Sequence, residues 1–125
     1  MAAIKSRGSK PEMAVRRLAH FLGFRFRLHR SDLPGKPDLV FGPRRKVIFV
    51  HGCFWHQHDR TNCLDGRLPK SNTAYWKPKL LSNVDRDRDN IAALISSGWK
   101  VLVVWECEVV DRHALKQTLL RFLSP

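Results

Sequence analysis

The sequence predicts a mixed α/β (α+β) fold, in which helices pack against the faces of a mixed sheet. Apolar residues recur at helical spacing in some segments, and they alternate or form short runs in others. These segments follow one another in the order helix, three strands, helix, strand, helix, which is typical of a layered structure. With 125 residues, 43% of them hydrophobic, the chain is expected to form a single domain, residues 1–125.

The first helix is predicted over Pro11–Leu22, where apolar residues keep the spacing of one helix face. Ser9 and Glu12 have the spacing of a capping box, in which each side chain bonds a backbone N–H near the helix start. Gly23 can end the helix in a left-handed conformation.

Three strands are predicted next. Phe24–Leu28 alternates apolar and cationic residues, as a strand with one solvated face does, and Leu33–Pro37 breaks the pattern. Asp38–Phe41 and Lys46–Val50 are short apolar runs joined through Gly42–Arg45, a turn of hairpin length.

The second half begins with Asp59–Thr73, a polar segment predicted to be a loop. Asn83 is predicted to cap a helix over Val84–Ser97, although the start of this helix near Tyr75 is left open because a proline follows at position 78. The run from Trp99 to Trp105 is predicted to be a buried strand. Asp111 is predicted to cap a last helix with Leu115, Leu119 and Phe122 inward.

The charge composition points to a polyanionic partner. The chain has 23 Lys and Arg against 11 Asp and Glu, a formal net charge of +12, spread along most of its length. Nucleic-acid phosphates attract such a protein, although a solvated basic surface is the alternative. No apolar run is long enough to span a membrane and residues 1–10 do not resemble a signal peptide, so we expect a cytoplasmic protein.

A carboxylate and two histidines are candidates for hydrolytic chemistry. Asp38 begins a strand directly after a turn, where it suits a hard divalent cation; a turn-capping aspartate is the alternative. His51 and His56 follow the next strand and are candidate bases, although single histidines are more often surface or core residues. Glu12 fits helix capping, or it orients His56 if the helix start faces the histidines.

Cysteine and aromatic residues surround these histidines. Cys53, His58 and Cys63, together with the distant Cys107, fit a tetrahedral structural Zn²⁺ site; buried thiols are the alternative. Three aromatics are candidates for stacking on bases or wedging between base pairs, with core packing as the alternative: Phe54, Trp55 and Trp76. The alternating charges of Asp85–Asp89 are interpreted as a charge-paired helix face.

Taken together, these residues closely resemble the very short patch repair (Vsr) endonucleases, which nick DNA beside a T:G mismatch. The resemblance spans nearly the whole chain. It rests on these motifs in order: Pro11-Glu12, Pro34-Gly35-Lys36-Pro37-Asp38, His51-Gly52-Cys53-Phe54-Trp55-His56, Tyr75-Trp76, Asn83-Val84-Asp85-Arg86-Asp87, Gly98-Trp99 and Trp105-Glu106-Cys107.

The resemblance implies a restriction-endonuclease-like fold and a set of catalytic roles. Asp38 would bind one or two Mg²⁺ together with the backbone carbonyl of Val50. His56 would be the general base with Glu12 as its orienting partner, and His51 a second catalytic histidine. The expected product is a nick with a 5′-phosphate.

The resemblance also implies roles for the remaining candidates. The zinc ligands would be Cys53, His58, Cys63 and Cys107. Four residues separate His58 from Cys63, whereas family members often have one or two at this point. Phe54, Trp55 and Trp76 would intercalate next to the mismatch, and Lys79 and Asn83 would contact the mismatched bases.

The leading hypothesis from the sequence is a Mg²⁺-dependent, zinc-stabilised endonuclease that nicks double-stranded DNA at mismatches. The expected substrates are T:G pairs left by deamination of 5-methylcytosine, and the expected setting is very short patch repair. Two alternatives stay open: a sequence-specific nuclease of a restriction system or mobile element, and a non-catalytic zinc-containing DNA-binding module. We expect a monomer, associated with the bacterial nucleoid when acting, with mismatch-repair proteins and a repair polymerase as partners.

Overall fold

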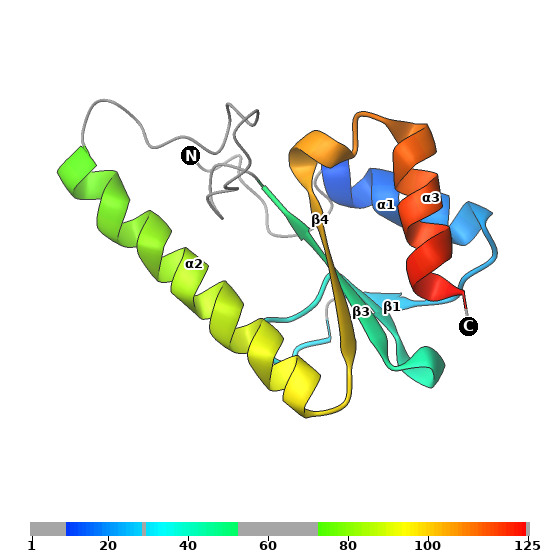
Figure 1. Cartoon of the computed structure of the whole chain (residues 1–125), viewed down its shortest axis with the longest axis horizontal. Helices are drawn as coiled ribbons and strands as arrows, with labels where there is room; N and C mark the ends of the chain where they lie inside the picture. The colour runs from blue at the N-terminus through cyan, green and yellow to red at the C-terminus, as the bar shows by residue number, and fades with distance from the viewer. Residues whose placement is uncertain (1–9, 29, 53–72, 125) are drawn as a thin grey trace.

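A computed structural model describes residues 10–28, 30–52 and 73–124, with side chains from residue 78 onward in the last range. Its helices and strands follow one another as the sequence predicts (Figure 1). In chain order they are α1 (Lys10–Phe21), β1 (Arg27–Leu28), β2 (Leu39–Phe41), β3 (Lys46–His51), α2 (Thr73–Ser96), β4 (Lys100–Trp105) and α3 (Arg112–Leu123). None of the helices in these ranges has the length and apolar character needed to cross a membrane.

The four strands form one mixed sheet in the order β1-β2-β3-β4. β1, β2 and β3 are joined antiparallel, with Leu39 opposite Ile48 across the β2–β3 hairpin. β3 and β4 are parallel, with His51 opposite Trp105 at their carboxyl ends. A parallel pair needs a long crossover connection, and the chain between β3 and β4 contains α2. The prediction of a mixed sheet is confirmed.

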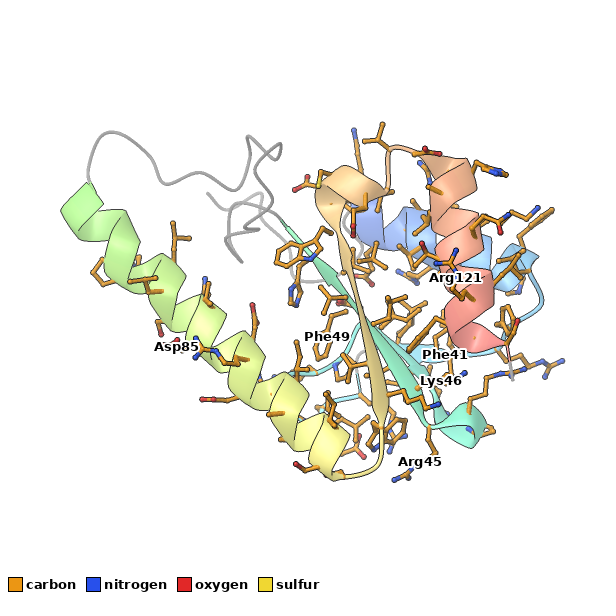
Figure 2. All side chains as sticks on the ribbon, in the orientation of Figure 1. Phe41, Arg45, Lys46, Phe49, Asp85 and Arg121 are labelled. Atoms are coloured by element: carbon orange, nitrogen blue, oxygen red, sulfur yellow. The ribbon has the colours of Figure 1, made fainter. Side chains whose placement is uncertain are left out.

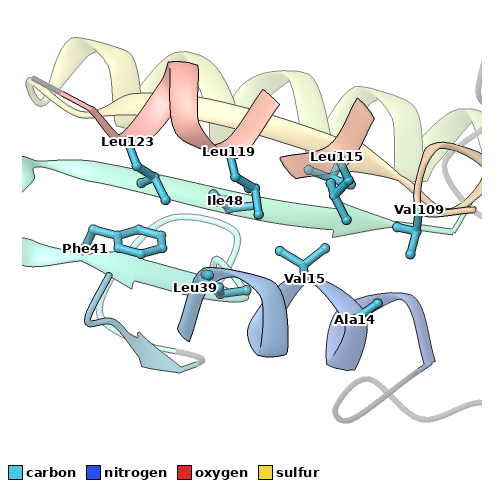
Figure 3. Close-up of a cluster of buried hydrophobic side chains, with 11 residues drawn as sticks. Ala14, Val15, Leu39, Phe41, Ile48, Val109, Leu115, Leu119 and Leu123 are labelled. Carbon is cyan, nitrogen blue, oxygen red and sulfur yellow. The ribbon is translucent and has the colours of Figure 1, made fainter. Parts of the chain in front are cut away.

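The helices cover both faces of the sheet. α1 and α3 lie on one face and α2 on the other (Figure 1). Alternate residues of β2 and β3 point to opposite faces, so each face has its own apolar cluster. Figure 3 shows the cluster beneath α1 and α3, whose buried members include Val15, Leu39, Phe41, Ile48, Leu115, Leu119 and Leu123. The cluster beneath α2 consists of Val40, Val47, Phe49, Leu94 and Trp99.

The end of α1 and the start of α3 confirm two of the predicted signals, whereas Ser9 of the predicted capping box lies outside the described residues. Asp111 is the N-cap of α3 and accepts a hydrogen bond from the Ala114 backbone N–H at 3.0 Å. Gly23 follows α1 with φ of 90°, the left-handed conformation that closes a helix. On α3, Leu115 and Leu119 are buried as predicted, whereas Phe122 is only partly buried.

Basic residues in and directly after the β2–β3 turn cap the carboxyl ends of two helices. The Arg45 guanidinium donates to the Ser97 carbonyl at 2.9 Å and lies 4.6 Å from the centroid of the Trp99 ring. The Lys46 ammonium donates to the Phe122 carbonyl at 2.6 Å. Cations at these positions satisfy unpaired carbonyls and oppose the negative end of the helix dipole. Burial of the Lys46 ammonium, together with nearby positive charges, lowers its pKa.

α2 has the earlier of the two starts that the sequence left open, and the predicted N-cap at Asn83 is wrong. α2 starts at Thr73, so Asn83 lies inside the helix rather than at its N-cap, and the rest of the predicted loop Asp59–Thr73 lies outside the described residues. Leu80 and Leu94 are both buried and lie 14 residues apart, about four helical turns, on one face. Their burial offsets the backbone hydrogen bond that Pro78, near the helix start, does not donate.

Two strands also differ from prediction. The segment predicted over Phe24–Leu28 contributes only Arg27–Leu28 to the sheet, because β2, its partner, is itself short. The sequence predicts a buried β4, but along it only Val104 is fully buried. Its position at the end of the described strand order explains this, since an edge strand has a neighbour on one side only.

Candidate active site

A tight turn places Asp38 at the start of β2. The Lys36 backbone N–H donates to the Leu33 carbonyl at 3.1 Å, with Pro34 second in the turn and Gly35 third at φ of 75°. These features are those of a type II turn, which needs a positive φ at its third residue. A Cβ added to Gly35 would lie 3.0 Å from Asn90 Cβ and 3.1 Å from Phe49 Cζ. Glycine therefore allows the turn to press against α2 and β3.

The carboxylate of Asp38 reaches across to β3. Asp38 Oδ2 accepts a hydrogen bond from the Val50 backbone N–H at 2.7 Å, although the two residues are 12 positions apart. Asp38 is half-buried. The structure thus brings together the two residues that the resemblance pairs as magnesium ligands.

The Val50 carbonyl lies on the same edge of β3 as Asp38. In an extended strand, the N–H and C=O of one residue point toward the same neighbouring strand. A carboxylate and a carbonyl are the hard oxygen donors that Mg²⁺ prefers, and water and substrate phosphate complete its shell. The donor set of Asp38 and Val50 therefore fits a magnesium site. In the described ranges no group of three or more His, Cys, Asp or Glu residues is arranged to hold a metal, but this kind of site needs only one carboxylate.

His51 is the last residue of β3 and is held between two aromatic rings. Its side chain is buried, 5% exposed. Its ring centroid lies 5.6 Å from that of Phe49 and 5.2 Å from that of Trp105, the latter in an edge-on arrangement. This packing fixes the imidazole at the carboxyl end of the strand, one residue beyond Val50.

Asp87 on α2 is a candidate that the sequence interpretation missed. Asn90 packs against Gly35, which lies beside Phe49, so this part of α2 faces the turn and β3. α2 runs opposite to β3 (Figure 1). From Asn90, three residues toward the start of α2 lead to Asp87, about 4.5 Å along the helix axis. From Phe49, two residues along β3 lead to His51, about 6.6 Å along the strand. Asp87, which is half-buried, therefore lies on the part of α2 toward the His51 end of β3.

The charges of Asp85–Asp89 do not all belong to one face. Asp85 and Arg88 are exposed and form an ion pair at 2.7 Å, as the sequence predicts for a charge-paired face. Figure 2 shows Asp85 on the side of α2 away from the sheet. Asp87 instead lies on the face of α2 that packs against the sheet. It is seven residues, about two helical turns, from both Leu80 and Leu94, which are buried. Helical periodicity separates Asp87 from its neighbours and is the signal that would have found it.

Glu12 lies in the first turn of α1 and is almost fully buried, 2% exposed. Its carboxylate is 3.6 Å from the Arg16 guanidinium. A surface capping residue would keep its carboxylate in water, because burying a charge is unfavourable unless it is compensated. Burial therefore favours a further role for Glu12, while Ser9 and His56, its two predicted partners, lie outside the described residues.

The structure describes the side chains of two of the three predicted DNA-contacting residues of α2. Lys79 is exposed and Asn83 is half-buried, and the Asn83 side-chain oxygen is 3.4 Å from an Arg86 guanidinium nitrogen that donates to it. The backbone of Trp76 is helical, but its side chain lies outside the described part.

Of the predicted zinc ligands, only Cys107 falls in the described ranges. It is exposed and lies in the short 3-10 turn Glu106–Glu108, which follows β4 directly. The other candidates in this region lie outside the described residues: Cys53, Phe54, Trp55, His56, His58 and Cys63.

Comparison with known proteins decides the family. A family model described as DNA mismatch endonuclease Vsr matches residues 1–62. The DNA mismatch endonuclease Vsr of Escherichia coli is 41% identical over 120 residues, which cover 96% of this chain and 75% of that protein. The chain belongs to the Vsr family. Vsr proteins are DNA endonucleases, and so is this chain.

Another relative is more similar in sequence. The type II nicking enzyme V.XorIIP of Xanthomonas oryzae pv. oryzae is 53% identical over 125 residues, which cover all of this chain and 90% of that protein. Among solved structures, the catalytic domain of the homing endonuclease I-Bth0305I matches with a TM-score of 0.64 at 19% identity. That match covers 92% of this chain and 94% of that domain, and it shows a shared fold.

Proposed function

We propose that this Vsr-family chain is a Mg²⁺-dependent endonuclease that nicks one strand of double-stranded DNA at mismatches. The preferred substrates are T:G pairs that arise from deamination of 5-methylcytosine, in very short patch repair. The observation that carries the proposal is the contact between Asp38 and the Val50 N–H beside the buried ring of His51. We assign the fold to the restriction-endonuclease-like class.

The proposed roles follow from the chemistry of each side chain. Asp38 and the Val50 carbonyl would hold the magnesium ion, which when bound supplies positive charge to the scissile phosphate and the leaving oxygen. His56 takes a proton from the attacking water, and Glu12 orients His56. His51, fixed by its aromatic neighbours, stabilises charge near the same phosphate.

The remaining candidates hold and read the DNA. We propose that Phe54, Trp55 and Trp76 wedge into the base stack, while Lys79 and Asn83 contact the mismatched bases. Cys53, His58, Cys63 and Cys107 would hold one structural Zn²⁺. Nicking one strand needs one active site, so a monomer suffices, and the nick would pass to mismatch-repair proteins and a repair polymerase.

The test is a nicking assay on end-labelled duplexes that differ at one base pair. The purified chain is incubated with T:G, other mismatched and fully paired duplexes, with Mg²⁺ or with a chelator. We expect one strand to be cut beside the mismatched T, only with Mg²⁺, and a 5′-phosphate on the downstream product. Equal cleavage of paired and mismatched DNA would remove the repair proposal.

One alternative has a specific observation in its favour. Several relatives are named type II nicking enzymes, including one from Neisseria meningitidis that is 42% identical over 123 residues. A chain with the same chemistry but a restriction-type preference would cut a paired sequence specifically. Binding of mismatched DNA without any cleavage would favour the other alternative, a DNA-binding module.

We predict that Asp87→Asn lowers the nicking rate about 10- to 100-fold, the range typical for loss of a group that supports a metal site. The physical reason is the position of Asp87, which lies on the same face of α2 as the buried Leu80 and Leu94 and toward the His51 end of β3. Single-turnover rates measure the effect. Asp85→Asn is the matched control, because Asp85 is exposed and its loss removes only a surface ion pair. Equal rates for the two variants would contradict a role for Asp87.

A further inference from the structure

Two residues other than glycine have positive φ in the described ranges, Lys36 at 49° and Arg45 at 56°. Both therefore occupy the left-handed region, which is unfavourable for a residue with a Cβ. Such conformations persist where the surrounding structure imposes them, and they concentrate at functional sites. The two residues differ in what their side chains contact.

The conformation of Arg45 has a structural explanation. Its guanidinium donates to the Ser97 carbonyl at the end of α2 and lies over the Trp99 ring. Its left-handed backbone also forms the C-cap of the 3-10 turn Gly42–Arg44. These contacts offset the unfavourable φ, and Figure 2 shows Arg45 near the start of β4, at the opposite end of that strand from Trp105.

Lys36 has no comparable contact within the described residues. Its side chain is exposed, and the structure records no hydrogen bond, ion pair or ring contact for it there. Its backbone N–H closes the turn by donating to the Leu33 carbonyl. Glycine would make the same hydrogen bond and would adopt the positive φ without a steric penalty. The fold alone therefore gives no reason for a lysine here.

The position of Lys36 supplies a reason. It lies two residues before Asp38, so their Cα atoms are at most about 7.6 Å apart. The turn is fixed on both sides of it, by Gly35 against Asn90 and Phe49 and by the fully buried Pro37. The side chain of Lys36 is thus exposed to solvent, on a turn whose backbone is held by packing on both sides, close to the candidate magnesium ligand Asp38.

We propose that Lys36 is a positioning residue that binds a DNA backbone phosphate adjacent to the scissile one. This inference rests on the proposed nicking function, because it uses Asp38 as the marker of the scissile phosphate. An ammonium on a flexible chain suits a phosphate as a point charge, and a fixed Cα limits the region that it can reach. The contact would set the register of the duplex relative to Asp38.

The test compares Lys36→Gly with Lys36→Arg by fluorescence anisotropy on mismatched duplex over a series of salt concentrations. Lys36→Gly relieves the unfavourable φ and removes the charge. We expect its Tm to rise by about 2–4 °C while Kd increases several-fold. The slope of log Kd against log salt should fall by about 0.9, the value for one lost phosphate contact. Lys36→Arg should keep the wild-type slope.

Arg45→Gly is the matched control, since it removes the same charge from the other left-handed position. We expect a lower Tm, because a helix cap is lost, and an unchanged salt slope. An unchanged slope in Lys36→Gly, or an equal fall in Arg45→Gly, would overturn the proposal. Failure of wild-type protein to nick any duplex would instead defeat the proposed function, and the salt slopes would still decide whether Lys36 contacts phosphate.

Discussion

Asp38→Ala is expected to abolish Mg²⁺-dependent nicking and to leave the affinity for mismatched duplex within about twofold of wild type. The carboxylate is the only charged ligand proposed for the metal, and its loss removes the stabilisation of the transition-state phosphate charge. We expect a fall of at least about 10³-fold in rate, equivalent to about 4 kcal/mol. Affinity should persist because the proposed aromatic and basic DNA contacts are untouched.

The same substitution also has a structural cost, which needs its own control. Asp38 accepts the Val50 N–H, and loss of that acceptor is expected to lower the free energy of unfolding by about 1 kcal/mol. Asp38→Asn keeps an oxygen acceptor for this N–H but removes the charge, so it should be more stable than Asp38→Ala and equally inactive.

A second control uses another carboxylate close in sequence. Asp32 is exposed and paired with Arg30 at 2.6 Å. The Arg30 guanidinium holds the pKa of the Asp32 carboxyl below its ordinary value through their hydrogen bond. Asp32→Ala should leave the nicking rate unchanged. Retention of more than about a tenth of the wild-type rate in Asp38→Asn would contradict the assignment of Asp38 as the metal ligand.

The amino-acid sequence predicts the order of elements and the β2–β3 hairpin because these features depend on local patterns. Apolar runs of three and four residues, Leu39–Phe41 and Val47–Val50, on either side of a Gly-Pro turn leave few alternatives to a hairpin. The hairpin in turn brings Asp38 to the His51 end of β3, so the local pattern is enough to predict that these two residues lie close together. The catalytic roles of the two residues are not tested by their positions.

Local signals left the start of α2 open between Asn83 and the neighbourhood of Tyr75. Asn83 is a preferred N-cap type and Pro78 is a helix breaker, which together favour a late start. The helix instead includes both residues, because Leu80 is buried. This is a tertiary effect that outweighs a local preference.

Asp87 and Lys36 escaped notice for different reasons. Asp87 stands in a run of alternating charges, and only its spacing from buried leucines distinguishes it. The special feature of Lys36 is its backbone conformation, with φ of 49°. Lysine, unlike glycine or asparagine, does not indicate a positive φ, so the sequence could not have shown it.

Removal of the proposed zinc ion is expected to destabilise the end of the sheet that holds the candidate site. His51 and Trp105 are paired in the parallel register of β3 and β4, and their rings are in contact. Cys53 follows His51 by two residues in the sequence, just as Cys107 follows Trp105. Ligands at these two positions would tie together the chain segments that leave the paired strands.

Cys107→Ala tests this arrangement at the one proposed zinc ligand that lies in the described residues. We expect bound zinc to fall from about one per chain to well below one and Tm to drop by about 10 °C, corresponding to a loss of about 3 kcal/mol. Elemental analysis and thermal unfolding measure the two effects. The nicking rate should fall as well, because His56 lies within the sequence between the proposed ligands Cys53 and His58.

Glu106→Gln is the control for Cys107→Ala, because Glu106 is exposed in the same short turn and is not a proposed ligand. It should keep both the zinc content and the Tm of wild type. A chelator should reproduce the Tm loss in wild-type protein and add nothing further in Cys107→Ala, since both act on one site. Wild-type protein with little zinc and a Tm insensitive to chelation would show that Cys107 is an ordinary surface thiol, and the parallel pairing of His51 with Trp105 would then have to hold this end of the sheet unaided.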